Sequence, residues 1–463
     1  RFYQYYAVPA WQWATQDEST SKLFIIRSLT LLLNFAAYAF FLSQLLRENK
    51  VALLIGVSFF AALVADYGFT GFHALPLWFG MPSIFLHFSL GCIIAFTIKK
   101  KRIHYFLSLL CFSVSLLYYE SFLLNLAAIA FIIVASNRGA DNEPVAFFAW
   151  RTLVWDKRLW AFYGVALIYV AAYVSFQKLH PQSYAGFQLS IGNFGAVLQT
   201  AWKFSISGIA LGYSGRWSDL LNVSFAPAVL FFSVVATAAT TFAVLALTPE
   251  KRRIFGGWHA AMLAVLLFSP NVLHALTTRY QEWARIDPRY LGTYYSAFPL
   301  WLIIMLTLAV VIHSKLLRTV SKYAVAIMMA GLFLGFNHNL RAKQTFFETQ
   351  RVQAARHRDN QTAIRKITEL YPQTNAIVSK TLFLSEKGTL IAYDYWALWT
   401  KQNTGKQIKY SEILGKDIQG QVVALERLQE WKFPVFLTVP NSKRESGSIL
   451  LIVKDTNLLR AEI

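Results

Sequence analysis

The chain has 463 residues, of which 56% are apolar and only 15% are charged, and its mean hydropathy is +0.41. This composition is typical of a polytopic membrane protein and argues against a soluble globular protein. The net charge of +20 does not indicate a nucleic-acid partner, because the basic residues form short groups between apolar runs, as the loops of membrane proteins do.

The absence of several known motifs disfavours some classes of function. The sequence contains no Walker-type phosphate loop, no H-E-x-x-H zinc motif and no D-x-D motif, which disfavours ATP-driven transport, a zinc site and a cytoplasmic nucleotide-sugar domain. Cys92 and Cys111 both lie inside apolar segments, so we expect neither a disulfide framework nor a cysteine metal site. The chain begins at Arg1 without a methionine or a signal peptide, and we expect residues upstream to have been removed.

About ten apolar segments approach the roughly 20 residues that a membrane-spanning helix needs. In chain order they are residues 22–46, 50–65, 82–98, 103–117, 120–136, 159–177, 225–247, 255–276, 293–312 and 323–337. The segments 103–117 and 120–136 could instead form one long tilted helix. The sequence therefore predicts an all-α polytopic membrane protein.

Basic residues indicate how the segments are oriented. They concentrate in every second connector, for example Lys99–Arg102 and Lys251–Arg253. Cytoplasmic loops carry such an excess, so we place these connectors inside the cell. The alternation holds only if 103–117 and 120–136 are two spans, with Tyr118–Ser121 near the outer face.

Two carboxylates at the outer face are candidate functional groups. Asp66 ends one apolar segment and begins a loop that contains glycines, so it is either a solvated helix end or part of a site. Glu120 interrupts a strongly apolar region, where a carboxylate is costly unless it faces a cavity or a partner. Its alternative role is that of an interfacial carboxylate at a turn between two helices.

The stretch Thr277–Tyr290 combines arginines, carboxylates and aromatic residues between two apolar segments. Guanidinium groups suit the oxygens of an anionic headgroup, because they can form two parallel hydrogen bonds with them. Tyrosine and tryptophan also favour the membrane interface without any ligand. The candidate headgroup ligands in this stretch are Arg279, Tyr280, Arg285, Arg289 and Tyr290.

The stretch Lys178–Ser224 is too long for a plain connection between two spans. Residues 191–211 are moderately apolar and contain glycines, which predicts a helix on the membrane interface or a half-buried lid. Arg216 and Asp219 follow in a charged corner with aromatic neighbours and are candidates for headgroup contacts. Arg27, about one turn into the first span, either extends to the headgroups or binds phosphate.

The chain becomes more polar after Phe336. We expect a transmembrane domain with outer-face loops over 1–337 and a small extracytoplasmic α/β domain over 338–463. A polar helix is predicted to open the second domain, and Pro372 helps to end it. Tyr393–Trp396 could stack on a sugar, although such residues lie more often in a core. Short β-like runs occur at 376–378, 389–392, 435–439 and 449–453.

Three stretches suggest a family. They are K-K-K-R-I-H-Y-F-L-S-L-L-C-F-S-V-S-L-L-Y-Y-E-S at 99–121, S-P-N-V-L-H-A-L-T-T-R-Y-Q-E-W at 269–283 followed by R-Y-L-G-T-Y-Y at 289–295, and the polar helix 339–370 after the last span. With this layout the chain resembles the bacterial polytopic glycosyltransferases of the GT-C class, in particular the glucosyltransferases that modify O-antigen.

The resemblance implies an inverting transfer of a sugar from a polyprenyl-phosphate donor to a cell-surface glycan or lipid-linked acceptor, at the outer face of the bacterial cytoplasmic membrane. Such enzymes usually carry an essential carboxylate in the first outer loop. In this chain most of that loop would precede Arg1, and Asp17 and Glu18 are what remains of it. The resemblance also implies base or acceptor roles for Asp66 and Glu120, while arginines stabilise the leaving phosphate.

Two other classes of function stay open. An O-antigen polymerase or ligase would share the topology and the outer arginines but would take a lipid-linked oligosaccharide as donor. A flippase or transporter would need polar residues through the middle of several spans, and these spans have few. The implied partners are the polyprenyl-phosphate sugar, its acceptor and membrane lipid; no cofactor is certain, and a divalent metal stays open.

Overall fold

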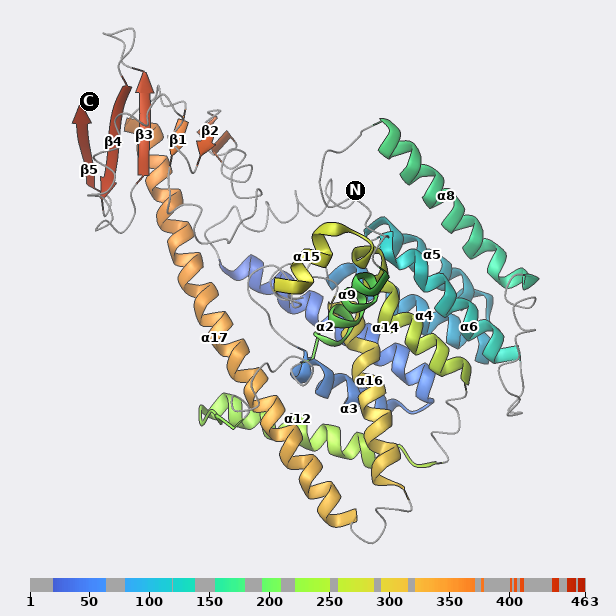
Figure 1. Ribbon diagram of the computed structural model, residues 1–463. Helices are drawn as coiled ribbons and strands as arrows, with labels where there is room; N and C mark the ends of the chain where they lie inside the picture. The colour runs from blue at the N-terminus through green and yellow to red at the C-terminus, as the bar shows by residue number, and fades with distance from the viewer. Residues whose placement is uncertain are drawn as a thin grey trace. The chain divides into compact units, whose positions relative to one another are not determined.

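The computed structural model of the chain is mainly helical (Figure 1). It divides into two compact units, Arg1–Phe346 and Phe347–Ile463. The predicted domain boundary at residues 337 and 338 stays a prediction. The residues that the structure describes are 20–63, 80–118, 120–137, 155–179, 194–209, 221–249, 257–286, 293–314, 321–370, 376–378, 400–401, 404–405, 409–411, 435–440, 448–454 and 457–462.

The helices follow the apolar segments of the sequence. They are α2 (Thr20–Leu46), α3 (Asn49–Ala62), α4 (Met81–Lys99), α5 (Arg102–Tyr118), the 3-10 helix η2 (Glu120–Asn125), α6 (Leu126–Asn137), α8 (Lys157–Leu179), α9 (Phe194–Ile206), α12 (Pro227–Ala246), α14 (Gly257–Ala275), α15 (Thr278–Ile286), α16 (Thr293–Ile312) and α17 (Ser321–Leu370). Each predicted apolar segment overlaps one of these helices, and segment 120–136 covers both η2 and α6.

Six helices in the described part of the chain are long and apolar enough to cross a membrane. They lie within α2, α4, α8, α12, α16 and α17, and α3, α5, α6 and α14 are shorter apolar helices. Large apolar side chains such as Leu167 and Ile168 of α8 and Phe231 of α12 are exposed, as lipid-facing residues are. These features identify an all-α membrane protein, as the composition predicts.

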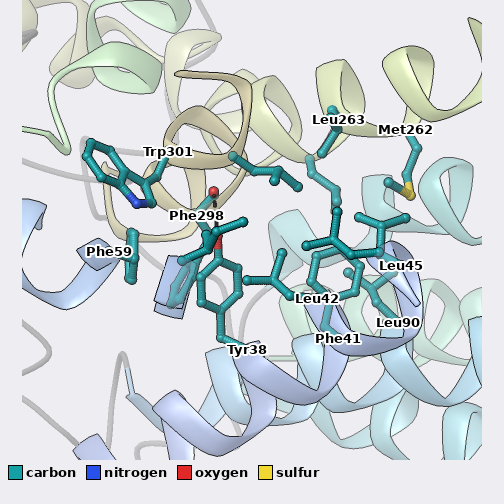
Figure 2. Packing of buried hydrophobic residues seen from close by; sticks show 14 of the residues in the cluster. Tyr38, Phe41, Leu42, Leu45, Phe59, Leu90, Met262, Leu263, Phe298 and Trp301 are labelled. Atoms are coloured by element: carbon teal, nitrogen blue, oxygen red, sulfur yellow. Dashed lines mark hydrogen bonds between the residues drawn. The ribbon is translucent and has the colours of Figure 1, made fainter. Parts of the chain in front are cut away.

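An aromatic cluster joins α2, α3 and α16 (Figure 2). The Tyr38 hydroxyl donates a hydrogen bond to the Phe298 carbonyl at 3.1 Å. The ring of Phe59 stacks on that of Phe298, with 4.2 Å between the centroids, and the indole nitrogen of Trp301 donates to the Ser58 hydroxyl at 3.0 Å. Tyr38 and Trp301 thus each have a hydrogen-bond partner for their polar group.

Helices α2 and α4 approach closely because Gly91 lacks a side chain. A Cβ atom at Gly91 would lie 2.6 Å from ring carbons of Phe40 and 3.2 Å from the Cα of Phe41. Small residues allow membrane helices to pack at short distance, where dispersion contacts between the backbones stabilise them. Any larger residue at position 91 would require the Phe40 ring to move and the α2 backbone to shift.

Contacts between helices show which of their ends meet. The ring of Phe96 contacts that of Tyr105, and the Tyr105 hydroxyl donates to the Arg158 carbonyl at 2.6 Å. Phe85 stacks on Tyr118 at the other end of α4 and α5. The basic starts of α5 and α8 therefore share one end of the unit, opposite to Tyr118; the side of the membrane that each end faces stays a prediction.

The chain reverses direction between α5 and α6. After Tyr118 the short helix η2 begins at Glu120, and α6 then packs against α4 and α8, two helices that α5 also contacts. A straight continuation of α5 would carry α6 away from both. Helices α5 and α6 are therefore separate helices, and that each of them crosses the membrane stays a prediction.

Two polar side chains of α17 satisfy the end of α3. The Asn339 amide donates to the carbonyls of Ala61 at 2.6 Å and Leu63 at 2.9 Å. The buried Lys343 ammonium donates to the Phe60 carbonyl at 2.6 Å. The last carbonyls of a helix have no partner within it and carry partial negative charge. Helix α3 therefore ends where α17 supplies hydrogen-bond donors.

Another face of α17 holds the segment that leads into α12. The side-chain amide of Asn337 accepts from the Ser224 N–H at 2.7 Å and donates to the Ser224 carbonyl at 3.1 Å. Arg341, four residues later and so on the same face, donates to the Asn222 carbonyl at 2.9 Å. Residues 337–343 thus connect α17 to the end of α3 and the approach to α12.

The C-terminal unit contains a five-stranded sheet in the order β2-β1-β3-β4-β5, in which only the β1–β2 pair is parallel. The runs at 376–378, 435–439 and 449–453 form β1, β3 and β4, whereas 389–392 and Tyr393–Trp396 lie outside the described residues. An independent α/β domain stays a prediction. The strands are β1 (Ala376–Val378), β2 (Lys409–Ser411), β3 (Val435–Pro440), β4 (Ser448–Lys454) and β5 (Asn457–Glu462).

We predict that Lys343→Met destabilises the helical unit by about 1–3 kcal/mol, because carbonyls at the end of α3 lose a hydrogen-bond donor while they stay buried. Unfolding in detergent can be followed with a thiol-reactive dye, since Cys92 and Cys111 are buried until the protein unfolds. The matched control is Lys322→Met on the exposed start of the same helix, which should leave Tm unchanged. Equal Tm values for the two variants would contradict the role of Lys343.

Candidate functional site

Helix α9 is a short amphipathic helix inside the long connector before α12. It has 13 residues and so spans about 20 Å, too little to cross the hydrocarbon core of a bilayer. It buries Val197, Ala201 and Phe204 and exposes Phe194 and Trp202. The prediction of a short helix here instead of a full span is confirmed, and its place at a membrane interface stays a prediction.

Helix α15, which carries predicted headgroup ligands, is attached to its neighbours by side-chain hydrogen bonds. Lys203 of α9 donates to the carbonyl of Ala284 at 3.3 Å, in the last turn of α15. The buried amide of Gln281 donates to the Ala275 carbonyl at 2.9 Å, which is the end of α14. A cation at the end of a helix also stabilises its dipole. The two bonds fix α15 against α9 and α14.

Pro270 lies inside α14, the helix before α15, and buried polar side chains gather around it. Pro270 has no N–H, so the carbonyl of Leu266 loses its partner within the helix and the helix is locally weakened. The hydroxyl of Ser296, from α16, donates to the next carbonyl, that of Leu267, at 2.6 Å. A side chain of a neighbouring helix therefore supports the backbone of α14 where the proline interrupts it.

Two asparagines extend this cluster to α9 and η2. The Asn271 amide nitrogen donates to the Ser296 hydroxyl at 2.7 Å and to the Ser205 hydroxyl at 3.0 Å. The Ser269 hydroxyl donates to the Asn125 side-chain oxygen at 2.6 Å. All five side chains are buried. We call Asn125, Ser205, Ser269, Asn271 and Ser296 the Pro270 polar cluster.

The structure places some of the predicted site residues. Tyr280 is half-buried on α15, and its ring meets that of His274 edge-on at 4.6 Å. Arg285 is exposed in the last turn of α15. Glu120 opens η2, Arg279 lies in the first turn of α15 and Arg27 lies in α2, but only their backbones are described.

Helix α14 brings two of the predicted segments together. It packs against η2, which begins with Glu120, and against α15, which carries Arg279 and Arg285. The bond between Ser269 and Asn125 belongs to the same junction. The carboxylate-bearing turn and the arginine-bearing helix thus share a supporting helix, while no described contact links Arg27 to them.

Several predicted site residues lie outside the part of the chain that the structure describes, so their roles stay predictions. They are Asp17, Glu18, Asp66, Arg216, Asp219, Arg289 and Tyr290.

Metal binding also stays open. Among the described residues, no group of three or more His, Cys, Asp or Glu side chains could hold a metal ion. A site that uses Asp17, Glu18 or Asp66 would involve residues beyond that part of the chain.

Sequence reasoning missed the buried residues of the site. Lys203 has no sequence signal of a role, yet it contacts the end of the helix that bears Arg285. Asn125 and Asn271 are single amide residues inside apolar runs. Such residues were a usable signal, because a buried amide in a membrane helix needs hydrogen-bond partners. Ser205 and Ser296 carry no such signal, since serines in apolar helices usually bond to their own backbone.

We predict that Ser296→Ala destabilises the unit by about 1–3 kcal/mol, because the buried Leu267 carbonyl and the Asn271 amide both lose a partner. The matched control is Ser115→Ala. Ser115 is equally buried, but its hydroxyl donates only to the Phe112 carbonyl of its own helix, which already lies in a hydrogen-bonded helix, so a smaller effect is expected. Thermal unfolding in detergent measures both; a larger loss for Ser115→Ala would contradict the prediction.

Comparison with known proteins identifies no relative of this chain. No protein-family model, no curated protein and no solved structure matches the chain, so its function is argued from its residues and their geometry.

Proposed function

We propose that this protein is a membrane glycosyltransferase of the GT-C kind, which moves a sugar from a polyprenyl-phosphate donor to a cell-surface glycan or a lipid-linked acceptor. The observation that carries the proposal is the junction on α14, where η2 with Glu120 and α15 with Arg279 and Arg285 pack against one helix. A transferase of this kind needs a carboxylate and phosphate-binding cations close together. The proposal is supported by the packing of both segments against α14.

A lysine of a neighbouring helix lies close to the arginine-bearing end of α15. Lys203 reaches the Ala284 carbonyl, one residue before Arg285, so an ammonium group lies at the end of α15 that bears an exposed guanidinium group. Ammonium and guanidinium groups both bind phosphate oxygens, and guanidinium groups can do so with two bonds at once. We therefore assign Lys203 to the phosphate-binding set together with Arg279 and Arg285.

The proposed reaction is a displacement at the anomeric carbon. A hydroxyl oxygen of the acceptor attacks this carbon and gives its proton to a carboxylate, for which Glu120 and Asp66 are the candidates. The bond from the anomeric carbon to the phosphate oxygen breaks, and polyprenyl phosphate leaves with the electron pair. The arginines and Lys203 stabilise the negative charge on that phosphate. The product has the inverted configuration.

We further propose that the protein lies in the bacterial cytoplasmic membrane with α15 at its outer face. The support is the separation of the two ends of the helical unit, since the basic starts of α5 and α8 meet at the end opposite Tyr118. Cytoplasmic connectors carry such basic residues. In this arrangement the four shorter apolar helices also cross the membrane, which gives ten spans, and the C-terminal unit is extracytoplasmic.

The buried polar residues of α12 give no support to transport. The hydroxyls of Ser233, Thr237 and Thr240 donate to the carbonyls of Val229, Ser233 and Ala236, one turn back in their own helix. Such groups are satisfied locally and offer no polar path across the membrane. A polymerase or ligase would differ in its donor, which the assay below tests directly.

We predict that purified protein releases polyprenyl phosphate from a polyprenyl-phosphate monosaccharide when an acceptor glycan is present. Arg285→Gln and Lys203→Gln should each lower kcat/KM by about 10²-fold, the size of effect expected for a lost donor to a developing oxyanion. The matched control is Arg102→Gln, at the exposed start of α5, which should retain full activity.

Two results would contradict the proposal. If the wild-type protein released no polyprenyl phosphate but moved the intact lipid across liposome membranes, the transport class would replace it. If it accepted only lipid-linked oligosaccharides, the polymerase or ligase class would do so.

A further inference from the structure

Exposed basic residues gather where the start of α5 meets the start of α8, two helices that pack against each other (Figure 1). The Tyr105 hydroxyl donates to the Arg158 carbonyl at 2.6 Å, and the Tyr105 ring meets that of Phe162 edge-on at 5.6 Å. These contacts hold the two helix starts together. Four of the basic residues precede Tyr105 in the chain and one precedes Arg158. We call them the Lys100 basic patch: Lys99, Lys100, Lys101, Arg102 and Lys157.

The positive charge of the patch is not balanced within the described part of the chain. Asp156, just before α8, is engaged with Arg158, whose Nε donates to the Asp156 Oδ1 at 2.9 Å, and the two side chains form an ion pair. Between the patch and a carboxylate, no ion pair occurs among the described residues. Neighbouring like charges repel each other, so a bound anion would lower the electrostatic energy of the patch.

The electrostatics of the helices do not account for these cations. A cation stabilises the C-terminal end of a helix and destabilises the N-terminal end. Lys99 follows this rule at the end of α4, but Arg102 and Lys157 are the first residues of α5 and α8. Neither of these two helices has an acidic residue in its first turn. The cations at the helix starts therefore indicate an anion from outside the chain.

The backbone at Lys100 is a separate observation. Lys100 ends α4 in the left-handed conformation, with a φ of 56°. Glycine adopts this conformation freely and is the usual residue at such a helix end, whereas other residues adopt it at a cost. A cation occupies a position where glycine would be more stable, and a strained residue of this kind motivates a functional explanation.

Apolar side chains beside the patch select an amphiphilic partner. Ile98, Ile103 and Phe106 are exposed next to the cations of α4 and α5, and Trp155 and Trp160 are exposed at the start of α8. A free phosphate or a nucleic acid would contact the cations and leave this apolar surface uncovered. A phospholipid uses both, because its headgroup is charged and its chains are apolar. Tryptophan also favours the headgroup level of a membrane.

We propose that the Lys100 basic patch binds the headgroup of an anionic phospholipid, whose acyl chains lie along the exposed apolar side chains of α5 and α8. Basic clusters next to membrane helices bind anionic lipids in this way. The inference does not depend on the proposed transferase activity. The patch lies at the end of the unit opposite Tyr118, and its occupant is a lipid of the bilayer instead of the sugar donor.

The test measures how phosphatidylglycerol and phosphatidylcholine with the same acyl chains bind to the full chain in a neutral detergent, by native mass spectrometry. The wild-type protein should bind phosphatidylglycerol about tenfold more tightly or better, and added salt should weaken this preference. Lys157→Gln should raise the Kd for phosphatidylglycerol about fivefold, the effect of one cation near an anionic lipid. The matched control is Lys178→Gln, at the other, exposed end of α8, which should leave the Kd unchanged.

Lys100→Gly separates lipid binding from folding. Glycine suits the left-handed conformation at position 100, so the Tm without added lipid should not fall. The Kd for phosphatidylglycerol should nevertheless rise about fivefold, because one cation is lost. A merely structural role of Lys100 would not give this combination.

Several outcomes would overturn the proposal. They are equal Kd values of the wild-type protein for the two lipids, equal effects of Lys157→Gln and Lys178→Gln, and an unchanged Kd in Lys100→Gly. Excess inorganic phosphate should not displace phosphatidylglycerol, since it lacks the acyl chains. Its displacement would show that the patch binds a free anion instead of a lipid.

Discussion

The helical unit depends on one constraint: wherever a helix ends or is interrupted in an apolar environment, another part of the chain must satisfy its backbone. Asn339 and Lys343 of α17 do so for the end of α3. Ser296 donates to the Leu267 carbonyl, next to the Leu266 carbonyl that Pro270 deprives of its helical partner. In water these carbonyls could bond to solvent, but in a membrane protein each needs a specific side chain, so these few polar contacts determine which helices are neighbours.

The same constraint explains why the candidate site lies where it does. The interruption of α14 and the 3-10 turn of η2 both weaken regular hydrogen bonding, and polar residues gather at their junction. Once buried amides and hydroxyls are present, a polar ligand can be bound there without a large desolvation penalty for the protein. The candidate site and the structural support of the backbone thus share this junction.

Much of the helical architecture was predictable because it depends on local properties. Apolar segment length located the apolar helices, although not α15, and the charge at Glu120 marked the reversal between α5 and α6. The change of character after Phe336 marked the polar part of α17, although its bonds to Ser224 and Leu63 were not predictable. Those partners lie more than 100 residues away, and no local pattern encodes such a pairing. Among the site residues, Arg285 and Tyr280 were predicted, whereas Lys203 and the Pro270 polar cluster were not.

The sequence by itself determined the class of the protein, the positions of its apolar helices and the segments rich in arginine and carboxylate, because hydrophobicity and charge are properties of single residues. Only the tertiary structure decided that η2, α9 and α15 meet on α14, that Asn125 pairs with Ser269, and that Asn271 pairs with Ser205 and Ser296. That choice is made by packing and by the pairing of buried polar groups, which depend on the whole set of neighbours at once.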